Sequence, residues 1–500
     1  MEYNLFMKKI LLLFAFLMCT AKVADAQDID SIVNRAAKAY FTNGQRIGVS
    51  IGVIQKGKIH QYHYGSTQKG KIVKANNETI YEIGSITKTF TGMLLAQAVR
   101  DKKVGLNDDI RKYLKGDYPN LEYKGKPIQL LHLANLTSGL PDNLPEKMPP
   151  FKAAGRDSQL FELKKIHDEY SRSQFLTDLH QVQLVREPGL NPSHSNTAAE
   201  LLGFLLENIY GLSYDALLIR YITGPLTMKN TFVSVPASKE KQRAKGYNEK
   251  GTLMPEIPKD AAGAGVLQST LPDMIRYANY HLTGKDDRVL LSHNLSWGDL
   301  DNSGIGLSWW LKTNFDGKRK IWTSGGTFGF SSYCVLYPES GFGVVALANE
   351  NDGGAEDALS GIASAIYNEV YFSATQRASL GFGFSKSINI LLVELNKPGF
   401  QSAAESVNDL KKKDDSFKLS EGELNNFGYY LLNKASKDKA LEIFKLNTIL
   451  FPGSSNTFDS LAETYESIGD KDSAIKNYKR ALELDPGNSN SAEHLKKLEN

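Results

Sequence analysis

The sequence predicts two folded parts: an α/β domain of the α+β type, with an antiparallel sheet and a helical insertion, and then an all-α repeat module. Strand-like runs of alternating polarity occur near residue 50 and again near residue 340, with helical periodicity between them. The C-terminal region repeats with a period of 34 residues. A chain of 500 residues exceeds what one core usually supports, and a hydrophobic share of 41% is enough for globular cores.

The N-terminus has the composition of a secretory signal. Two lysines precede the short apolar run "ILLLFAFLMC", and the small-residue stretch "ADA" ends at Ala26. The run is shorter than the roughly 20 residues that span a bilayer. We therefore expect a signal peptide over residues 1–26, no stable membrane span after its cleavage, and a secreted or periplasmic protein. Cleavage there would leave Cys334 as the single cysteine, which excludes an intramolecular disulfide.

Two predicted hairpins bracket the first part, residues 30–370. "RIGVSIGVIQKGKIHQYHYG" alternates apolar and polar residues around the turn-like "QKGK", and "SSYCVLYPESGFGVVALAN" holds two strand-like runs joined by "PESG". Segments of helical period lie between them, such as "TAAELLGFLLENIYG" and "PDMIRYANYHL". We predict one sheet built from both ends of this part, with a mostly helical insertion.

The C-terminal part, residues 420–500, contains two copies of a 34-residue unit. Pro452 and Pro486 are 34 residues apart, and aromatic and small residues recur at matching positions, which is typical of tetratricopeptide repeats. The predicted elements are a helical connector at 371–419, repeats at 420–453 and 454–487, and the capping helix "NSAEHLKKLEN". The connector either adds a layer to the stack or packs against the first domain. A stack of this kind offers a surface for a protein partner.

A candidate nucleophile lies in "YEIGSITKTFTGMLLAQAV", where Ser85 and Lys88 are one turn apart at the start of an apolar helix. The spacing alone is weak evidence, because the chain contains five Ser-x-x-Lys matches, which start at Ser66, Ser85, Ser238, Ser436 and Ser473. The other four lie in polar surroundings. Burial of Lys88 would lower its pKa, so that a neutral amine could activate the serine hydroxyl.

Two further motifs follow along the chain. They are His194-Ser195-Asn196 before a helix, in "REPGLNPSHSNTAAELLG", and Thr323-Ser324-Gly325-Gly326 before a strand, in "KIWTSGGTFGFSS". Each has a purely structural alternative. Ser195 and Asn196 could only cap the helix that follows them, and "SGGTFG" could be only a turn before a strand. All three motifs in one order are much harder to explain in this way.

In this order the motifs resemble those of the serine β-lactamase and penicillin-binding-protein superfamily: Ser-x-x-Lys, a Tyr/Ser-x-Asn triplet, and a Lys/His-Thr/x-Gly triplet. The flanking stretches "LLHLANLTSGLP", "PLTMKNTF" and "AAGAGVLQSTLPDM" are closest to the class C β-lactamase-related branch, which includes esterases, D-aminopeptidases and D,D-carboxypeptidases. The resemblance implies a β-lactamase/transpeptidase-like fold over residues 30–370. It also implies an exported serine hydrolase that acts on a β-lactam, a D-amino acid peptide or a small ester.

The resemblance also implies roles for individual residues. By position, Ser85 corresponds to the acylated nucleophile, and Lys88 corresponds to its proton acceptor. Asn196 corresponds to the residue that orients the substrate amide, and the backbone N–H groups of Ser85 and Gly326 correspond to the oxyanion hole. The remaining substrate-binding positions are Thr323, Ser324 and Gly325.

Two positions depart from the family pattern. His194 occupies the position of the usual Tyr, and Thr323 that of the usual Lys or His. An imidazole exchanges protons near neutral pH, so His194 is a candidate catalytic residue. Thr323 lacks the cation that commonly binds a substrate carboxylate. These changes keep an alternative open: a catalytically impaired, penicillin-binding-like pseudoenzyme that acts as a binding or scaffold protein through its repeats.

Other chemistries have little support in the sequence. A formal net charge of +3 is too small to indicate a nucleic-acid partner. "HQYH" lies on a predicted strand without zinc-ligand spacing, and no phosphate-cradling glycine-rich loop precedes a Lys-Ser/Thr pair. We therefore expect no metal and no cofactor, no nucleic acid, and a small-molecule or peptide substrate.

Overall fold

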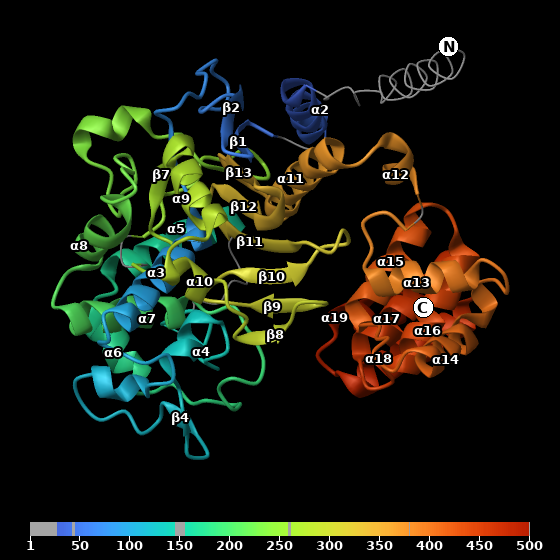
Figure 1. Ribbon diagram of the computed structural model, residues 1–500. Coiled ribbons are helices and arrows are strands. Elements are labelled where there is room, and N and C mark those ends of the chain that lie inside the picture. The colour runs from blue at the N-terminus through green and yellow to red at the C-terminus, as the bar shows by residue number, and fades with distance from the viewer. Residues whose placement is uncertain (1–27, 43–45, 146–155, 259–261, 380, 500) are drawn as a thin grey trace, which may run out of the picture.

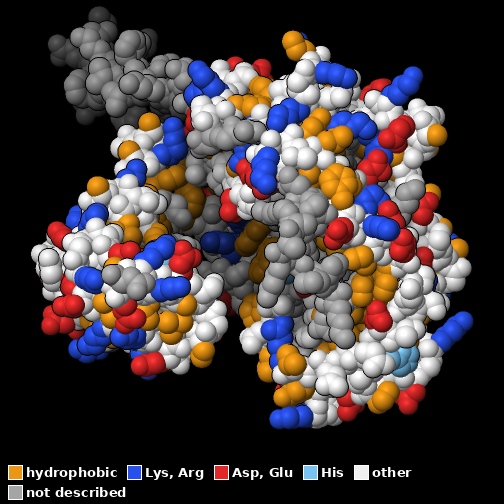
Figure 2. Space-filling view, turned by 180° about the vertical axis from the view of Figure 1, so that it is seen from behind, with side chains coloured by type: hydrophobic (Ala, Val, Ile, Leu, Met, Phe, Trp, Pro, Cys, Tyr) orange, Lys and Arg blue, Asp and Glu red, His pale blue; other side chains and the backbone are white. Residues whose placement is uncertain are grey.

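The computed structural model describes residues 28–42, 46–145, 156–258, 262–379 and 381–499. The predicted signal peptide lies outside the described residues. Figure 1 shows a sheet-containing first part and a helical C-terminal part. On the face shown in Figure 2, acidic and basic side chains are interspersed rather than grouped by sign. Within the described residues no single helix is long and apolar enough to cross a membrane. The helices Asn196–Tyr210 and Tyr214–Thr223, bent by 77° relative to each other, reach the length and hydropathy of a span only when they are taken together.

An antiparallel eight-stranded sheet forms the centre of the first part (Figure 1). In spatial order its strands are β2 (Lys58–Gly65), β1 (Gly48–Gln55), β13 (Phe342–Ala348), β12 (Ser331–Tyr337), β11 (Arg319–Gly326), β10 (Trp310–Thr313), β9 (Ser303–Ile305) and β8 (Trp297–Asp299). β1 pairs with β13, with Val49 opposite Ala348. The prediction of one sheet built from both ends of this part is confirmed.

Both predicted hairpins are present. β1 and β2 are joined by Lys56 and Gly57, which have φ of 49° and 82°. Positive φ at both residues is the geometry of a tight hairpin turn. β12 and β13 are joined by a short 3-10 turn, Pro338–Ser340, and by Gly341 with φ of 57°. Both turns lie where the polar stretches between the apolar runs predicted them.

Helices cover both faces of the sheet. On one face, α2 (Ile29–Thr42) and α11 (Ala355–Tyr371) share an apolar cluster with β1, β12 and β13. The inserted helices are α3 (Thr87–Arg100), α4 (Leu130–Ala134), α5 (Arg156–Glu169), α6 (Arg172–Leu179), α7 (Asn196–Tyr210), α8 (Tyr214–Leu218), α9 (Leu271–Thr283) and α10 (Asp287–Ser292). On the other face, the inserted helices form a larger apolar core with the sheet, in which α9 packs on the sheet and α3 packs on α7. The core holds α3 firmly because almost all of its residues are buried.

Short strands complete the first part. They pair as β3 (Ile80–Glu82) with β7 (Gln268–Thr270), β4 (Glu122–Tyr123) with β5 (Lys126–Pro127), and β6 (Tyr247–Asn248) with β14 (Glu350–Asn351). β3 leads into the segment that enters α3, and its pairing with β7 anchors that segment. This pairing links the start of α3 to a region almost 200 residues later.

Among the described residues of the C-terminal part, the regular secondary structure is helical. Its helices are α12 (Ala374–Ala378), α13 (Lys386–Leu395), α14 (Ala403–Lys413), α15 (Glu421–Asn433), α16 (Lys437–Leu450), α17 (Ser455–Ile468), α18 (Lys471–Leu484) and α19 (Ser489–Glu499). α13 and α14 share one apolar cluster with α15 and α16, so the connector adds a layer to the stack. Gly428 faces the ring of Phe444, and an added Cβ there would lie 2.5 Å from that ring. Leu495 and Leu498 of α19 pack on the last helix pair.

Candidate active site

Ser85 lies between a strand and a buried helix. β3 leads into the 3-10 turn η1 (Gly84–Ile86), and α3 begins at Thr87. Lys88 donates a hydrogen bond from Nζ to Ser85 Oγ over 2.8 Å. All five Ser-x-x-Lys matches lie within the described residues, and Ser85 is the only one of these serines hydrogen-bonded to the lysine three positions later. The structure therefore brings together the predicted pair and no rival pair.

Burial sets the proton chemistry of Lys88. Its side chain is 4% exposed, and its ammonium group also donates to Asn196 Oδ1 over 2.7 Å and to Ala264 O over 3.0 Å. Burial lowers the pKa of Lys88 from 10.5 to about 8, although nearby carboxylates act in the opposite direction. A lysine with this pKa can lose its proton near neutral pH and then accept the proton of Ser85.

The second motif divides between helix capping and the site. Ser195 is the N-cap of α7, and its Oγ accepts the Ala198 N–H over 3.0 Å. Asn196 is the first residue of α7. Its Oδ1 accepts from Lys88, and its Nδ2 donates to Asn143 Oδ1 over 2.9 Å. The capping alternative thus describes Ser195, whereas Asn196 lies beside Lys88.

His194 has a carboxylate partner that the sequence did not predict. Its Nδ1 lies 2.6 Å from Asp142 Oδ1, and both side chains are 55% exposed. Burial acts to raise the pKa of Asp142, but the hydrogen bond from His194 and the charges of His194 and Lys88 hold it below its ordinary value. An ionised Asp142 accepts the Nδ1–H and leaves Nε2 as the nitrogen available to a substrate. No motif marked Asp142, because it lies 52 residues earlier in a loop.

The third motif ends β11 and touches the backbone at Ser85. A Cβ added at Gly325 would lie 2.7 Å from Ser85 N, and one added at Gly84 would lie 2.9 Å from Gly326 N. Glycine permits this close approach because any side chain would overlap the neighbouring backbone. The N–H groups of Ser85 and Gly326 therefore belong to adjacent segments, as an oxyanion hole requires.

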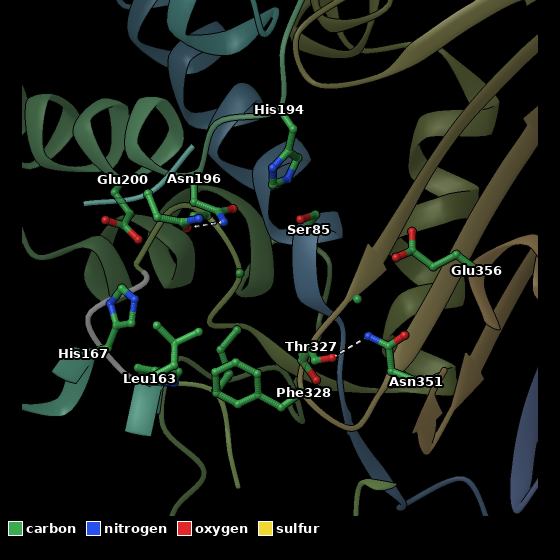
Figure 3. A pocket seen from close by; sticks show the side chains of 16 residues that line it. Ser85, Leu163, His167, His194, Asn196, Glu200, Thr327, Phe328, Asn351 and Glu356 are labelled. Atoms are coloured by element: carbon green, nitrogen blue, oxygen red, sulfur yellow. Dashed lines mark hydrogen bonds between the residues drawn. The ribbon is translucent and has the colours of Figure 1, made fainter. Parts of the chain in front are cut away.

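Ser85 lies where two cavities meet, with volumes of about 410 and 270 Å³. The predicted site residues that line them are Ser85, His194 and Gly326 in both, Asn196 in the larger, and Lys88, Thr323 and Ser324 in the smaller. Gly325 packs behind the Ser85 backbone instead. Figure 3 shows the larger cavity, with His194 close to Ser85 and with Asn196 and Glu356 on opposite sides.

Carboxylates outnumber cations around these cavities. Glu200, one turn after Asn196 on α7, lines the larger cavity, and Glu356 of α11 lines both. Among the lining residues that the structure describes, Lys88 is the only Lys or Arg. Nothing in the sequence marked these two glutamates, because their place depends on how α7 and α11 converge on Ser85.

A Gly-x-Ser-x-Gly match at residues 48–52, a pattern typical of nucleophile elbows, does not form a second active site. Ser50 lies within β1 and is fully buried. Its Oγ is 2.8 Å from His63 Nδ1, and His63 Nε2 is 2.9 Å from Asn77 Oδ1. These bonds satisfy buried polar groups in a strand that substrate cannot reach. No group of three or more metal-ligating side chains occurs among the described residues.

Comparisons with known proteins match both parts of the chain. A family model described as Beta-lactamase matches residues 33–367, and one described as Tetratricopeptide repeat matches residues 457–488. The Beta-lactamase of Escherichia coli (strain K12) is 29% identical over 368 residues, which are 66% of this chain and 90% of that protein. Protein flp of Staphylococcus aureus (strain MRSA252) is 28% identical over 380 residues, 73% of this chain and 71% of flp.

A solved structure is similar as well. The crystal structure of a beta-lactamase/D-alanine carboxypeptidase from Yersinia pestis, complexed with citrate, superposes with a TM-score of 0.60 and 25% identity. The match covers 69% of this chain and 99% of that chain. Almost all of that crystallised chain therefore corresponds to about two thirds of the present one.

Proposed function

Because this chain belongs to the β-lactamase family, we propose that it is an exported serine hydrolase that cleaves an amide or ester through an acyl-enzyme on Ser85. The observation that carries the proposal is the 2.8 Å contact between Ser85 Oγ and the buried Nζ of Lys88, whose pKa is about 8. A serine hydroxyl is a weak nucleophile until a neighbouring base removes its proton. Export is supported by the composition of residues 1–26.

Acylation uses the groups that meet at Ser85. Neutral Lys88 takes the hydroxyl proton while Oγ attacks the substrate carbonyl carbon. The N–H groups of Ser85 and Gly326 donate to the carbonyl oxygen as it gains negative charge. The intermediate collapses when the leaving group takes a proton from Lys88 or His194, which leaves an ester on Ser85. Water then attacks this ester and gives a proton to Lys88 or His194. That proton passes to Ser85 Oγ as the ester bond breaks, which releases the acid and restores the serine hydroxyl.

The substrate classes are a β-lactam, a D-amino acid peptide and a small ester. The similarity to the Escherichia coli Beta-lactamase and to the Yersinia pestis beta-lactamase/D-alanine carboxypeptidase supports the first two for this chain. Thr323 supplies a hydroxyl where the family usually has a cation, which weakens recognition of a substrate carboxylate. A cavity of about 410 Å³ suits a small ligand or the end of a peptide.

Covalent labelling tests the proposal. We expect incubation with a fluorophosphonate to add one adduct to the intact mass, and peptide mapping to place it on Ser85. A penicillin adduct at Ser85 would show that the site accepts β-lactams. Folded protein that forms neither adduct would contradict the hydrolase proposal and favour the catalytically impaired binding protein. A fluorophosphonate adduct without a penicillin adduct would direct the search to esters and peptides.

We predict that His194 transfers protons in this reaction. His194→Phe keeps a ring without an exchangeable proton and should lower kcat/KM by about ten- to a hundredfold. His194→Tyr, which restores the family residue, should recover much of the activity. Asp142→Asn should lower kcat/KM by about tenfold, because the ring loses the carboxylate that orients it. pH profiles of kcat/KM provide the measurement.

The control is Asp286→Asn, which removes a carboxylate that lines neither cavity and that pairs with Arg288. It should leave the shape of the pH profile unchanged. Wild-type kcat/KM at every pH in His194→Phe would contradict a catalytic role and leave His194 as a residue that only fills space beside the pocket.

The repeats support a further part of the proposal, a protein partner bound by the C-terminal stack. Tetratricopeptide repeats form extended surfaces that bind other proteins. The two repeat pairs, with the α13–α14 layer and the α19 cap, make a stack whose apolar core is internal. The partner would act independently of the chemistry, because no predicted site residue lies in the repeats.

A further inference from the structure

Glu356 is a carboxylate that lines both cavities together with Ser85. It is the second residue of α11 and is partly exposed. A Cβ added at Gly326 would lie 2.7 Å from Glu356 Oε1, so this oxygen faces the backbone of Gly326. Within the described part of the chain, Glu356 forms neither a hydrogen bond nor an ion pair, although its charge raises the pKa of Lys88. The carboxylate is open to a ligand in the cavity.

A carboxylate at this position opposes catalysis unless a cation joins it. If the Gly326 N–H stabilises the oxyanion, negative charge develops close to Glu356, and like charges repel more strongly in a partly buried site. Lys88 becomes a cation when it takes the Ser85 proton, but its ammonium bonds to Asn196 Oδ1 and Ala264 O, and the Lys88 and Glu356 side chains form no ion pair in the described structure. Among the described lining residues no other Lys or Arg is available. The missing positive charge can come from the substrate.

We propose that Glu356 binds a cationic amine of the substrate, so that the preferred substrates are amides or esters of acyl groups that carry a free ammonium next to the scissile carbonyl. This inference rests on the proposed function, with Ser85 as nucleophile. A carbonyl oxygen held at Gly326 N places a substituent on the adjacent carbon within a few ångströms of Gly326, which is where Glu356 Oε1 lies.

The smaller cavity contains further groups that suit an ammonium. Trp310 and Ser324 line it together with Glu356. An aromatic face attracts a cation, and a hydroxyl oxygen accepts one of its three N–H donors. The ring of Trp310 stacks at 6.2 Å on Trp322 of the neighbouring strand, which holds it in place. A substrate carboxylate would meet the charge of Glu356 instead and would be repelled.

A pair of covalent probes tests this inference. Diphenyl 1-aminoethylphosphonate carries a free amine, and its N-acetyl derivative carries the same electrophile without the charge. With either probe Ser85 Oγ forms a bond to phosphorus, phenoxide leaves, and the serine proton protonates it to phenol. We expect the full-length protein to label about ten- to a hundredfold faster with the amine probe, measured by intact mass with both enantiomers.

Glu356→Gln should bring the two labelling rates to within a few-fold of each other. The matched control is Asp357→Asn, which removes the same charge from the next residue of α11; Asp357 is exposed and lines neither cavity. This variant should keep the wild-type ratio. Using a ratio cancels the change in Lys88 reactivity that loss of a neighbouring carboxylate causes.

The outcomes separate this inference from the proposed function. Labelling by an uncharged fluorophosphonate with equal rates for the amine and N-acetyl probes would overturn the role of Glu356 and leave the hydrolase proposal intact. A wild-type preference that persists in Glu356→Gln would overturn it too. Failure of all three reagents to label Ser85 would overturn both.

Discussion

The Ser85→Ala variant is expected to form no acyl-enzyme and to lose at least about a thousandfold in kcat/KM on any substrate that the wild-type protein hydrolyses. The reason is chemical: alanine has no oxygen to attack the carbonyl, and Lys88 then has nothing to deprotonate at this position. The fold should persist, because Lys88 Nζ keeps two other acceptors, Asn196 Oδ1 and Ala264 O. Steady-state kinetics and thermal melting of the same preparations provide the measurement.

Ser66→Ala and Ser238→Ala are the matched controls, since each serine precedes a lysine by three positions. The Ser66 hydroxyl bonds to backbone carbonyls of its own turn, and Ser238 lies in an exposed 3-10 helix. Both variants should keep wild-type kinetics and the adduct on Ser85. An acyl label mapped to any other serine, or turnover that survives in Ser85→Ala, would refute the assignment of the nucleophile.

The second large effect concerns Lys88. We expect kcat/KM to rise with pH through a limb near pH 8, because the lowered pKa of Lys88 makes the neutral, base-competent form dominant only above that pH. At pH 7 about a tenth of the molecules would carry neutral Lys88, against less than about a thousandth for an unperturbed lysine. Lys88→Met, similar in length but unable to accept a proton, should lower kcat/KM by about a thousandfold and remove the limb. Lys88→Arg should fail as well, because a guanidinium stays protonated.

Glu200→Gln gives an independent check on the direction in which the pKa of Lys88 shifts. The carboxylate of Glu200 stabilises the Lys88 ammonium and so raises its pKa, against the larger effect of burial. Removing that charge should lower the pKa and move the limb to lower pH. A limb that shifts upward in Glu200→Gln, or that remains in Lys88→Met, would show that another group controls the profile.

Local features of the fold could be predicted from the sequence because their causes are local. The alternation of polarity around "QKGK" and "PESG" specifies hairpins, and the 34-residue period specifies stacked helix pairs. The contact between Ser85 and Lys88 belongs to this class, since a helix places residues three apart on one face. The domain bounds and the roles of the site residues remain predictions.

Other features depended on the tertiary structure. Neither Asp142 nor Glu356 belongs to a motif with a recognisable spacing. Asp142 reaches the site from a loop, and Glu356 reaches it from α11, which packs on the face of the sheet opposite to α3. The sequence likewise could not show whether Ser195 capped a helix or joined the site, because both arrangements use the same residue type before a helix.

By itself, then, the sequence determined the two-part organisation, the hairpins, the repeats, and the serine and lysine that share one turn. Only the tertiary structure decided the electrostatics around them. The pKa of Lys88 reflects its burial and three carboxylates, Glu200, Asp142 and Glu356. Burial and Coulomb energies depend on distances across the packed molecule rather than on order along the chain, so a site rich in carboxylates emerged only when separate elements converged on Ser85.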